Sequence, residues 1–255
     1  MFAIERRQKI MSLLFDKRSI LVQDTAALFK VTEETIRRDL KVLEKQGLLT
    51  RTHGGAVLLD DIRSEVPLEI REGINIKGKN LIGREAAKLV NDGDTILLDA
   101  STSSLYVAKH LKDKKGLTVI TNAERIVLEL APCDDITIIC TGGILRSKSL
   151  SYIGRVAEKA IGNYHADKVF FSCKGFSPKR GMTDSNEAES DIRKLMIRCS
   201  EKSVFLCDNT KFDKVGYINT ARLDEIDYFY TDTTIPDEWR SEFDRHRVQL
   251  VTVTE

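Results

Sequence analysis

From residue 76 onwards the sequence alternates short apolar runs with helical segments, and this alternation restricts the fold more than any other feature. The apolar runs have the length of buried strands, as in "DTILLDA", "LTVITN", "ITIICTGG", "DKVFFSCKG" and "SVFLCD". Segments with helical spacing separate them, for example "SSLYVAKHL" and "EAESDIRKLMIRCS". Strands that alternate with helices are typical of βαβ units. We therefore predict an α/β fold, with a mostly parallel, doubly wound sheet in residues 76–255.

The first 57 residues follow a different pattern, which predicts three short helices and a hairpin. The helices are expected at Ile4 to about Phe15, at Gln23–Phe29, and from Thr32 to a stop at Gly47. "LLTRTHGGAVLL" then alternates around a Gly-Gly pair, which indicates a tight turn. Residues 1–57 hold 11 Lys and Arg against 7 Asp and Glu, a net charge of +4 in a chain of net charge +1. A basic small domain is thus expected before residues 58–75, a linker without firm periodicity.

The third helix has an apolar stripe that suits packing against the small domain. Thr32 stands at the N-cap position, where its hydroxyl can accept a hydrogen bond from a free backbone N–H. A rotation of about 100° per residue puts Ile36, Leu40 and Leu43 on one buried stripe. The opposite face of the helix is left with cations.

That outward face predicts DNA binding. It carries Arg38 and Lys41, with Thr35 and Arg37 on its flanks. A short helix, a turn and a second helix with a basic face form a helix-turn-helix, here at about residues 20–39. Arginine can hold guanine by two hydrogen bonds, and threonine can meet a thymine methyl group or a phosphate. The alternative is that these cations are simply solvated.

The hairpin after the helix would be a basic wing that reaches phosphates or the minor groove, with Arg51 and His53 at its tip.

Polar and small residues follow several predicted strands at their carboxyl ends, where ligands bind in α/β sheets. "DASTSS", directly before a helix, offers four hydroxyls and the N–H groups of a helix N-terminus, which suits a phosphate. The alternative is that Ser101 or Thr102 is merely an N-cap. The candidate effector contacts are Asp99, Ser101, Thr102, Ser103, Ser104, Thr121, Asn122, Gly142, Gly143, Lys174, Asp208 and Lys211.

The N-terminal motif resembles the winged helix-turn-helix of the DeoR family of bacterial transcription regulators. The resemblance extends from Arg6 to Val57 and is carried by T-x-R-R-D-L, followed by G-L-L and H-G-G-A. It implies contacts with DNA from the recognition helix through Thr35, Arg37 and Arg38, and a wing formed by His53, Gly54 and Gly55.

The runs "DGDTILLDASTSS", "TGGILRSKSLSYIG", "GMTDSNEAESDIRKLMI" and "CDNTKF" resemble the DeoR-family sensor domain. This resemblance covers nearly all of residues 76–232 and implies a fold similar to ribose-5-phosphate isomerase. It also implies a phosphorylated sugar or similar metabolite near Asp99, Ser101 to Ser104, Gly142, Gly143 and Lys211.

Three residues depart from the family pattern. Lys30 stands where the family often has a turn glycine; if φ is positive there, lysine costs on the order of 1 kcal/mol. Ser101 replaces a common glycine, so that its Cβ narrows the phosphate loop. Lys174 stands where many members have other residues, and it is a candidate for tuning the effector.

These observations favour a DNA-binding transcription regulator. The resemblance further implies a repressor of a carbohydrate-catabolism operon whose operator binding is modulated by a phosphorylated sugar. Dimers or larger assemblies are expected, as a homodimer or homotetramer, because paired recognition helices read paired half-sites. One alternative is a sugar-phosphate isomerase fused to a DNA-binding module, with a general base among Asp99, Asp184, Glu187, Glu189 and Asp208. A second alternative, RNA binding by the N-terminal module, lacks an aromatic stacking platform.

The remaining composition argues against other classes of function. The five cysteines form no C-x-x-C pair and lie mostly in apolar runs, so core positions are expected for them. The four histidines show no metal-ligand spacing, and we predict neither a metal nor a cofactor. No apolar run approaches the roughly 20 residues that span a bilayer. The N-terminus lacks a signal-peptide pattern, which predicts a cytoplasmic protein.

Overall fold

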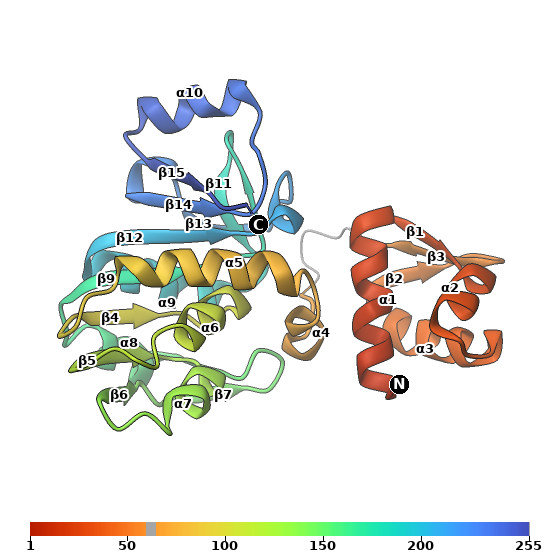
Figure 1. The fold of residues 1–255 in the computed structure, drawn as a ribbon, viewed down its shortest axis with the longest axis horizontal. Coiled ribbons are helices and arrows are strands. Elements are labelled where there is room, and N and C mark those ends of the chain that lie inside the picture. Colours follow the sequence, from red (N-terminus) through yellow and green to blue (C-terminus); the bar gives the residue numbers. More distant parts are fainter. Residues whose placement is uncertain (60–64, 255) are drawn as a thin grey trace. The chain divides into compact units, whose positions relative to one another are not determined.

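The computed structural model describes residues 1–59 and 65–254 and divides the chain into two compact units, Met1–Ile76 and Lys77 to the C-terminus (Figure 1). The first unit contains four helices and a small sheet of order β1-β3-β2, whose strand pairs are antiparallel. Its elements are α1 (Ala3–Lys17), β1 (Ser19–Leu21), α2 (Val22–Phe29), α3 (Glu33–Lys45), β2 (Leu49–Arg51), β3 (Gly55–Leu58) and α4 (Leu68–Glu72). The winged helix-turn-helix fold predicted for this part is confirmed.

The core of the first unit explains its local sequence. The predicted stripe of α3 is buried, and it packs with Ile10 and Leu14 of α1. Ile70 and Ile74 join this core, although the sequence analysis assigned both to the linker 58–75. The short helix α4 therefore belongs to the first unit, because its apolar residues are buried there. Residues 60–64 of the predicted linker lie outside the described part of the chain.

The second unit is built around a seven-stranded, wholly parallel sheet of order β15-β14-β12-β9-β4-β5-β6. Its strands are β4 (Thr95–Leu98), β5 (Leu117–Thr121), β6 (Ile136–Cys140), β9 (Ala166–Phe171), β12 (Ser200–Cys207), β14 (Tyr228–Thr231) and β15 (Gln249–Thr252). Its helices are α5 (Ile76–Ala86), α6 (Thr102–Lys109), α7 (Glu124–Leu130), α8 (Arg155–Ile161), α9 (Glu187–Arg198) and α10 (Asp237–Arg245), with short 3₁₀ helices at Ala87–Leu89, Asn209–Lys211 and Leu223–Glu225.

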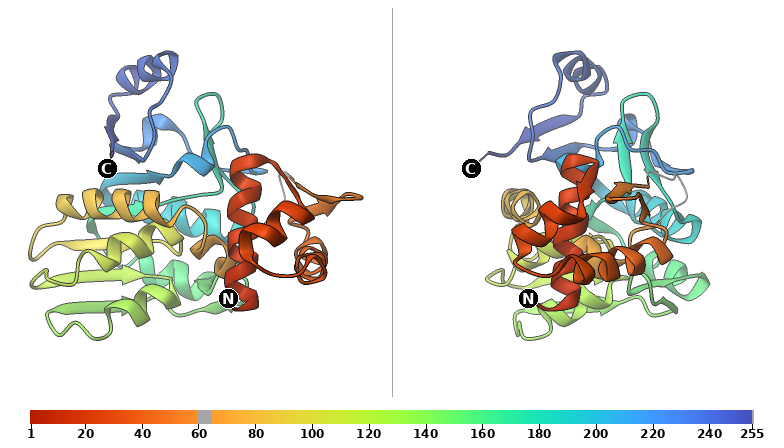
Figure 2. Two further views of the ribbon diagram at one scale, coloured as in Figure 1. Left: turned by 45° about the vertical axis from the view of Figure 1, so that its right-hand side comes forward. Right: turned by 90° about the vertical axis from the view of Figure 1, so that its right-hand side faces the viewer.

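Helices cover both faces of this sheet, as Figures 1 and 2 show. Successive residues of the central strands enter opposite cores: Leu98 and Phe170 face one side, whereas Leu97 and Phe171 face the other. Strands that are buried on both faces are apolar throughout, which is why the sequence showed continuous apolar runs. The predicted doubly wound α/β fold is confirmed.

Two smaller sheets were not predicted from the sequence. One is a hairpin of β7 (Ile144–Arg146) and β8 (Ser151–Ile153), and the other contains β10 (Gly175–Ser177), β11 (Gly181–Asp184) and β13 (Ile218–Ala221). Their strands have three or four residues, too few for a period of two to be distinguished from loop sequence.

Lys30 caps the C-terminus of α2 in the left-handed conformation, with a φ of 54°. A side chain with a Cβ is strained there, and glycine is not. We therefore predict that Lys30→Gly raises the free energy of unfolding of the first unit by about 1 kcal/mol. Native-state hydrogen exchange of the α3 amides measures this change. As a control, Lys41→Gly in the middle of α3 should lower the same free energy by about 1 kcal/mol. Equal losses in both variants would show that position 30 carries no strain.

Candidate functional site

The start of α3 is organised by two threonines. Thr32 is the N-cap, and its hydroxyl accepts a hydrogen bond from the Thr35 backbone N–H at 3.3 Å. The two threonine hydroxyls lie 2.9 Å apart. The predicted N-cap is thereby confirmed, and Thr35 is held at the first turn with its side chain partly satisfied.

The outward face of α3 carries cations of two kinds. Arg37 forms an ion pair with Glu33 at 2.7 Å, one helical turn away. Arg38 and Lys41 are exposed, and neither forms an ion pair with any residue that the structure describes. Arg38 and Lys41 therefore present uncompensated positive charge to solvent.

The wing differs in part from the prediction. Arg51 is bound by Glu44 of α3, through its side chain at 2.6 Å and its backbone N–H at 3.0 Å. His53 and Gly54 are exposed at the turn. A Cβ on Gly55 would lie 1.9 Å from the carbonyl oxygen of Ile20, so this glycine is needed for the close approach of β1 to β3.

The aspartate of the T-x-R-R-D-L motif has a structural role that the sequence analysis did not assign. Asp39 is buried, and its carboxylate accepts a hydrogen bond from Arg6 Nε at 2.5 Å. This ion pair joins α1 to α3. Since a carboxylate on the inner face of a helix needs a buried cation, the helical position of Asp39 was the available signal.

In the second unit, the strand order reverses beside β4. The chain proceeds from β4 to β5 and β6 on one side, and later adds β9, β12, β14 and β15 on the other. Ligands of doubly wound sheets bind outside the carboxyl ends of the strands at such a switch point. Asp99 follows β4 and Ser172 follows β9, so both lie at this point.

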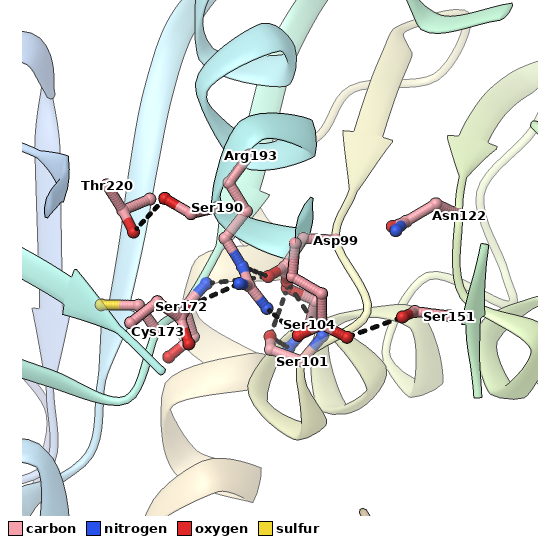
Figure 3. Close-up of polar contacts among 12 residues, drawn as sticks. Asp99, Ser101, Ser104, Asn122, Ser151, Ser172, Cys173, Ser190, Arg193 and Thr220 are labelled. Atoms are coloured by element: carbon pink, nitrogen blue, oxygen red, sulfur yellow. Dashed lines mark hydrogen bonds and ion pairs between the residues drawn. The ribbon is translucent and has the colours of Figure 1, made fainter. Parts of the chain in front are cut away.

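Asp99 is the centre of a buried polar network at the switch point (Figure 3). Its Oδ2 accepts a hydrogen bond from Arg193 Nε at 2.6 Å, and its Oδ1 accepts one from Ser104 Oγ at 2.6 Å. The Ser101 backbone N–H also donates to Oδ1, at 3.2 Å. Both carboxylate oxygens are thus engaged within the protein, which makes Asp99 a residue that shapes the loop before α6.

Some hydroxyls of "DASTSS" form hydrogen bonds within the protein, whereas that of Ser103 does not. Ser101 is the N-cap of α6, accepts from the Ser104 backbone N–H and donates to Ser104 Oγ. Ser103 Oγ is buried without a hydrogen-bond partner among the described residues. The backbone N–H groups of Thr102 and Ser103 occupy the first turn, where a helix leaves them unsatisfied. Unsatisfied donors therefore gather at Thr102 and Ser103.

Thr121, the last residue of β5, and Asn122, which follows it, differ in how their side chains are bonded. Thr121 Oγ1 donates to the Leu98 carbonyl at 2.7 Å and accepts from the Ala123 N–H, so its hydroxyl ties β5 to β4. Asn122 Nδ2 donates to the Tyr152 carbonyl at 3.0 Å, whereas Asn122 Oδ1 is buried and lacks a partner in the described residues. Only Asn122 offers an acceptor to a ligand.

The glycine pair after β6 packs against the β7–β8 hairpin. Gly142 and Gly143 both have positive φ, 63° and 114°. A Cβ on Gly143 would lie 2.7 Å from the Ile153 carbonyl oxygen, while one on Gly142 would meet nothing. The glycines are explained by backbone conformation and by the approach to β8.

Asp208, at the end of β12, has one satisfied and one unsatisfied oxygen. Oδ1 accepts from Thr210, whereas the buried Oδ2 has no hydrogen bond to a described residue and lies 3.9 Å from Lys211 Nζ. Burial opposes ionisation, but Lys211 and Lys79 hold the pKa of Asp208 below its ordinary value. Asp208 therefore remains a carboxylate with an open acceptor.

Cations surround this part of the site. Lys211 Nζ donates to the Cys173 carbonyl at 2.9 Å. Lys174, the residue after Cys173, is partly buried. Lys79, on the first turns of α5, is only 2% exposed and was missed by the sequence analysis. A lysine on the inner face of an amphipathic helix was the signal that would have identified it.

Arg193 is the other residue that sequence reasoning missed. It lies on α9, fully buried, with Nη1 2.5 Å from Asp184 Oδ2 and Nη2 3.6 Å from Glu189 Oε2, besides its bond to Asp99. Burial opposes its charge, yet Asp184, Asp99 and Glu189 raise its pKa well above the ordinary value. Three of the carboxylates considered as general bases are thus ion-paired to one guanidinium.

Other site types find no support in the described residues. No group of three or more His, Cys, Asp or Glu side chains among them could hold a metal ion. Within the same residues, no helix is long and apolar enough to span a bilayer.

Comparison with known proteins assigns both units. Residues 6–61 match the DeoR-like helix-turn-helix domain, and residues 74–233 match the DeoR C-terminal sensor domain. The chain is 44% identical to the uncharacterized HTH-type transcriptional regulator YulB of Bacillus subtilis, over 91% of this chain and 90% of the relative. It is 32% identical to the HTH-type transcriptional repressor GlcR of Bacillus subtilis (100% and 98% covered) and 32% identical to the L-fucose operon activator of Haemophilus influenzae (87% and 88% covered).

The solved structures give a more distant likeness. A D-ribose-5-phosphate isomerase in complex with phospho-erythronic acid is 15% identical, with a TM-score of 0.40 over 53% of each chain. This likeness carries no argument about function.

A winged helix with an outward basic face, joined to a parallel α/β sensor, defines a DNA-binding transcription regulator and not an enzyme. The chain belongs to the DeoR family.

The Arg193 network yields a stability prediction. Arg193→Met leaves Asp99 and Asp184 buried without their cation, which costs about 3–5 kcal/mol of the free energy of unfolding. Trp239, the only tryptophan, lies on α10 and reports unfolding of the second unit in urea. The control Arg222→Met removes an exposed pair with Asp224 and should change stability by about 0.5 kcal/mol or less. A loss no larger for Arg193→Met than for the control would refute the role of the network.

Proposed function

We propose that this protein binds operator DNA through α3 and the wing, that it represses a carbohydrate operon, and that a phosphorylated sugar modulates this binding. The effector part rests on one observation above all. Three buried polar atoms without a hydrogen bond in the described structure, Ser103 Oγ, Asn122 Oδ1 and Asp208 Oδ2, lie near the carboxyl ends of strands of one sheet. Buried polar groups are normally hydrogen-bonded, so such atoms suggest a ligand.

On the DNA side, the proposed base contact is Arg38, because it is exposed and uncompensated at the centre of the outward face. Lys41 and Arg37 would bind phosphates, and Thr32 and Thr35 would contact the duplex at the start of α3. In the wing, His53 and Gly54 approach the backbone, whereas Arg51 would first have to exchange Glu44 for a phosphate. Gly55 acts through packing. The proposed DNA-binding domain extends beyond residue 57 to include α4.

On the effector side, the phosphate is proposed to lie at the first turn of α6. The N–H groups of Thr102 and Ser103, the Ser103 hydroxyl and the positive end of the helix dipole all favour an anion there. Ser101 and Ser104 support the loop from within, because their hydroxyls are already bonded.

The sugar end is proposed to reach Asp208. A carboxylate oxygen without a partner needs a donor, and a sugar hydroxyl is one. Asp208 follows β12, two strand positions from β4, which is about 10 Å and roughly the length of a pentose or hexose phosphate. Lys174, Lys211 and Lys79 would neutralise the phosphorylated ligand, and Asn122 Oδ1 would accept a further hydroxyl.

The relatives differ in the sign of regulation, since one is named a repressor and another an activator of an L-fucose operon. We infer that the effector relieves repression. If it binds the domain arrangement with low DNA affinity more tightly, it shifts the population away from the DNA-bound arrangement. A dimer or tetramer is proposed because paired half-sites require paired recognition helices.

The recognition face is tested by Arg38→Ala. Loss of a bidentate guanine contact should weaken operator binding by about 1–3 kcal/mol, measured by gel shift with a duplex selected from a random library. Arg37→Ala is the matched control, and it should cost less because Arg37 is already shared with Glu33. Unchanged affinity for Arg38→Ala would place the recognition face elsewhere.

The effector site is tested by Ser103→Ala against Ser101→Ala. Pentose and hexose monophosphates should raise the melting temperature of the full chain, with inorganic phosphate and free sugars as controls. Ser103→Ala should weaken sugar-phosphate binding about tenfold without loss of stability, because its hydroxyl has no partner in the described structure. Ser101→Ala should instead cost about 1 kcal/mol of stability through the lost N-cap. Binding that is insensitive to Ser103→Ala would contradict the proposed phosphate position.

A further inference from the structure

We propose that the β7–β8 hairpin, residues 144–153, reports occupancy of the effector site, and that Arg146 is the positioning residue that couples the two. The inference rests on the proposed function, because it takes an effector to bind beside Asn122 and α6. It adds the element by which that binding changes the sensor domain.

The first attachment of the hairpin is a proposed ligand contact. Asn122 Nδ2 donates to the Tyr152 carbonyl at 3.0 Å, and the Tyr152 N–H donates to the Asn122 carbonyl at 2.7 Å. The remaining polar atom of the Asn122 side chain, Oδ1, is the unsatisfied one. A hydroxyl bound at Oδ1 therefore acts on a side chain that already holds β8.

The second attachment leads to the loop before α6. Glu189 Oε1 accepts hydrogen bonds from Arg146 of β7 at 2.6 Å and from Ser151 of β8 at 2.7 Å. Its other oxygen lies 3.6 Å from Arg193, which binds Asp99. An anion at α6 changes the electrostatic balance at Asp99 and Arg193, and Glu189 passes this change to both strands of the hairpin.

Glycines flank the hairpin at both ends. Gly142 and Gly143 precede β7, Gly154 follows β8, and all three have positive φ. Hinges need a few residues that absorb changes in φ and ψ, and glycine does so at least cost. The hairpin can thus turn as a unit.

Apolar contacts hold the outer strand of the hairpin only weakly. Ile144 and Leu145 of β7 are 68% and 47% exposed, so this strand buries little apolar surface against the rest of the domain. Leu150, in the turn, has a left-handed φ of 48°, a strained conformation for leucine. Strain of this kind persists only while the surrounding contacts hold it. The polar contacts to Asn122 and Glu189 are therefore two of the attachments that hold the hairpin. The others are the hydrogen bonds of Glu124 with Leu150 and Tyr152, and the packing of β8 against the core.

The test is hydrogen exchange of the full chain, read by mass spectrometry. The probe is the pentose or hexose monophosphate that gives the largest thermal shift. At saturation it should change the exchange rate of hairpin amides about fivefold or more. Arg146→Met keeps the apolar stem but loses the ion pair with Glu189. It should retain probe affinity within about threefold and abolish most of the change at the hairpin.

Two variants separate coupling from a general loss of structure. Arg146→Lys retains a cation for Glu189 and should restore part of the response. Lys148→Met removes an exposed hairpin cation outside the network and should respond as the unchanged protein does. The inference is overturned if a bound probe does not change the exchange rate of the hairpin amides, or if Arg146→Met leaves that change undiminished. Failure of every sugar phosphate to bind overturns the proposed function instead, and the inference with it.

Discussion

The structure of the sensor domain depends on one buried guanidinium. Arg193 is the cation shared by Asp99, which follows β4, by Asp184 of β11 and by Glu189 of α9. A buried carboxylate is tolerated only when it is paired and hydrogen-bonded, so the chain can place three of them at the switch point of the sheet because Arg193 is there. The loop before α6 follows from this pairing, since Asp99 in turn fixes Ser101 and Ser104.

The same network bears on the role of the carboxylates. The carboxylates nearest the switch point accept hydrogen bonds from a guanidinium and from a serine, so their oxygens are engaged within the protein. Ser103, Asn122 and Asp208 keep buried atoms without a hydrogen bond in the described residues, and the proposed effector would bind there. Such a site can bias an equilibrium between domain arrangements, and this is what a regulator with an exposed basic helix requires.

Sequence reasoning recovered the parts that repeat a strong local pattern. The alternation of apolar runs gave the parallel sheet, and the stripe Ile36, Leu40 and Leu43 placed the recognition helix correctly. The two small sheets were missed because strands of three or four residues are too short to show a period of two. Lys79 and Arg193 were missed although each lies on the inner face of its helix, because a charged residue there was not tested for burial; the partner Asp99 of Arg193 is also distant in sequence. The motif "DASTSS" located the loop but could not separate Ser101 and Ser104, which are bonded within the protein, from Ser103, which is not.

The central claim is that the Arg193 network positions the effector site without binding the effector itself. A crystal structure of the full chain with a bound sugar phosphate tests this claim most directly. The account predicts phosphate oxygens within hydrogen-bonding distance of Ser103, a sugar hydroxyl on Asp208 Oδ2, and an intact bond between Arg193 and Asp99. A phosphate bound by Arg193, with Asp99 displaced from it, would contradict the account.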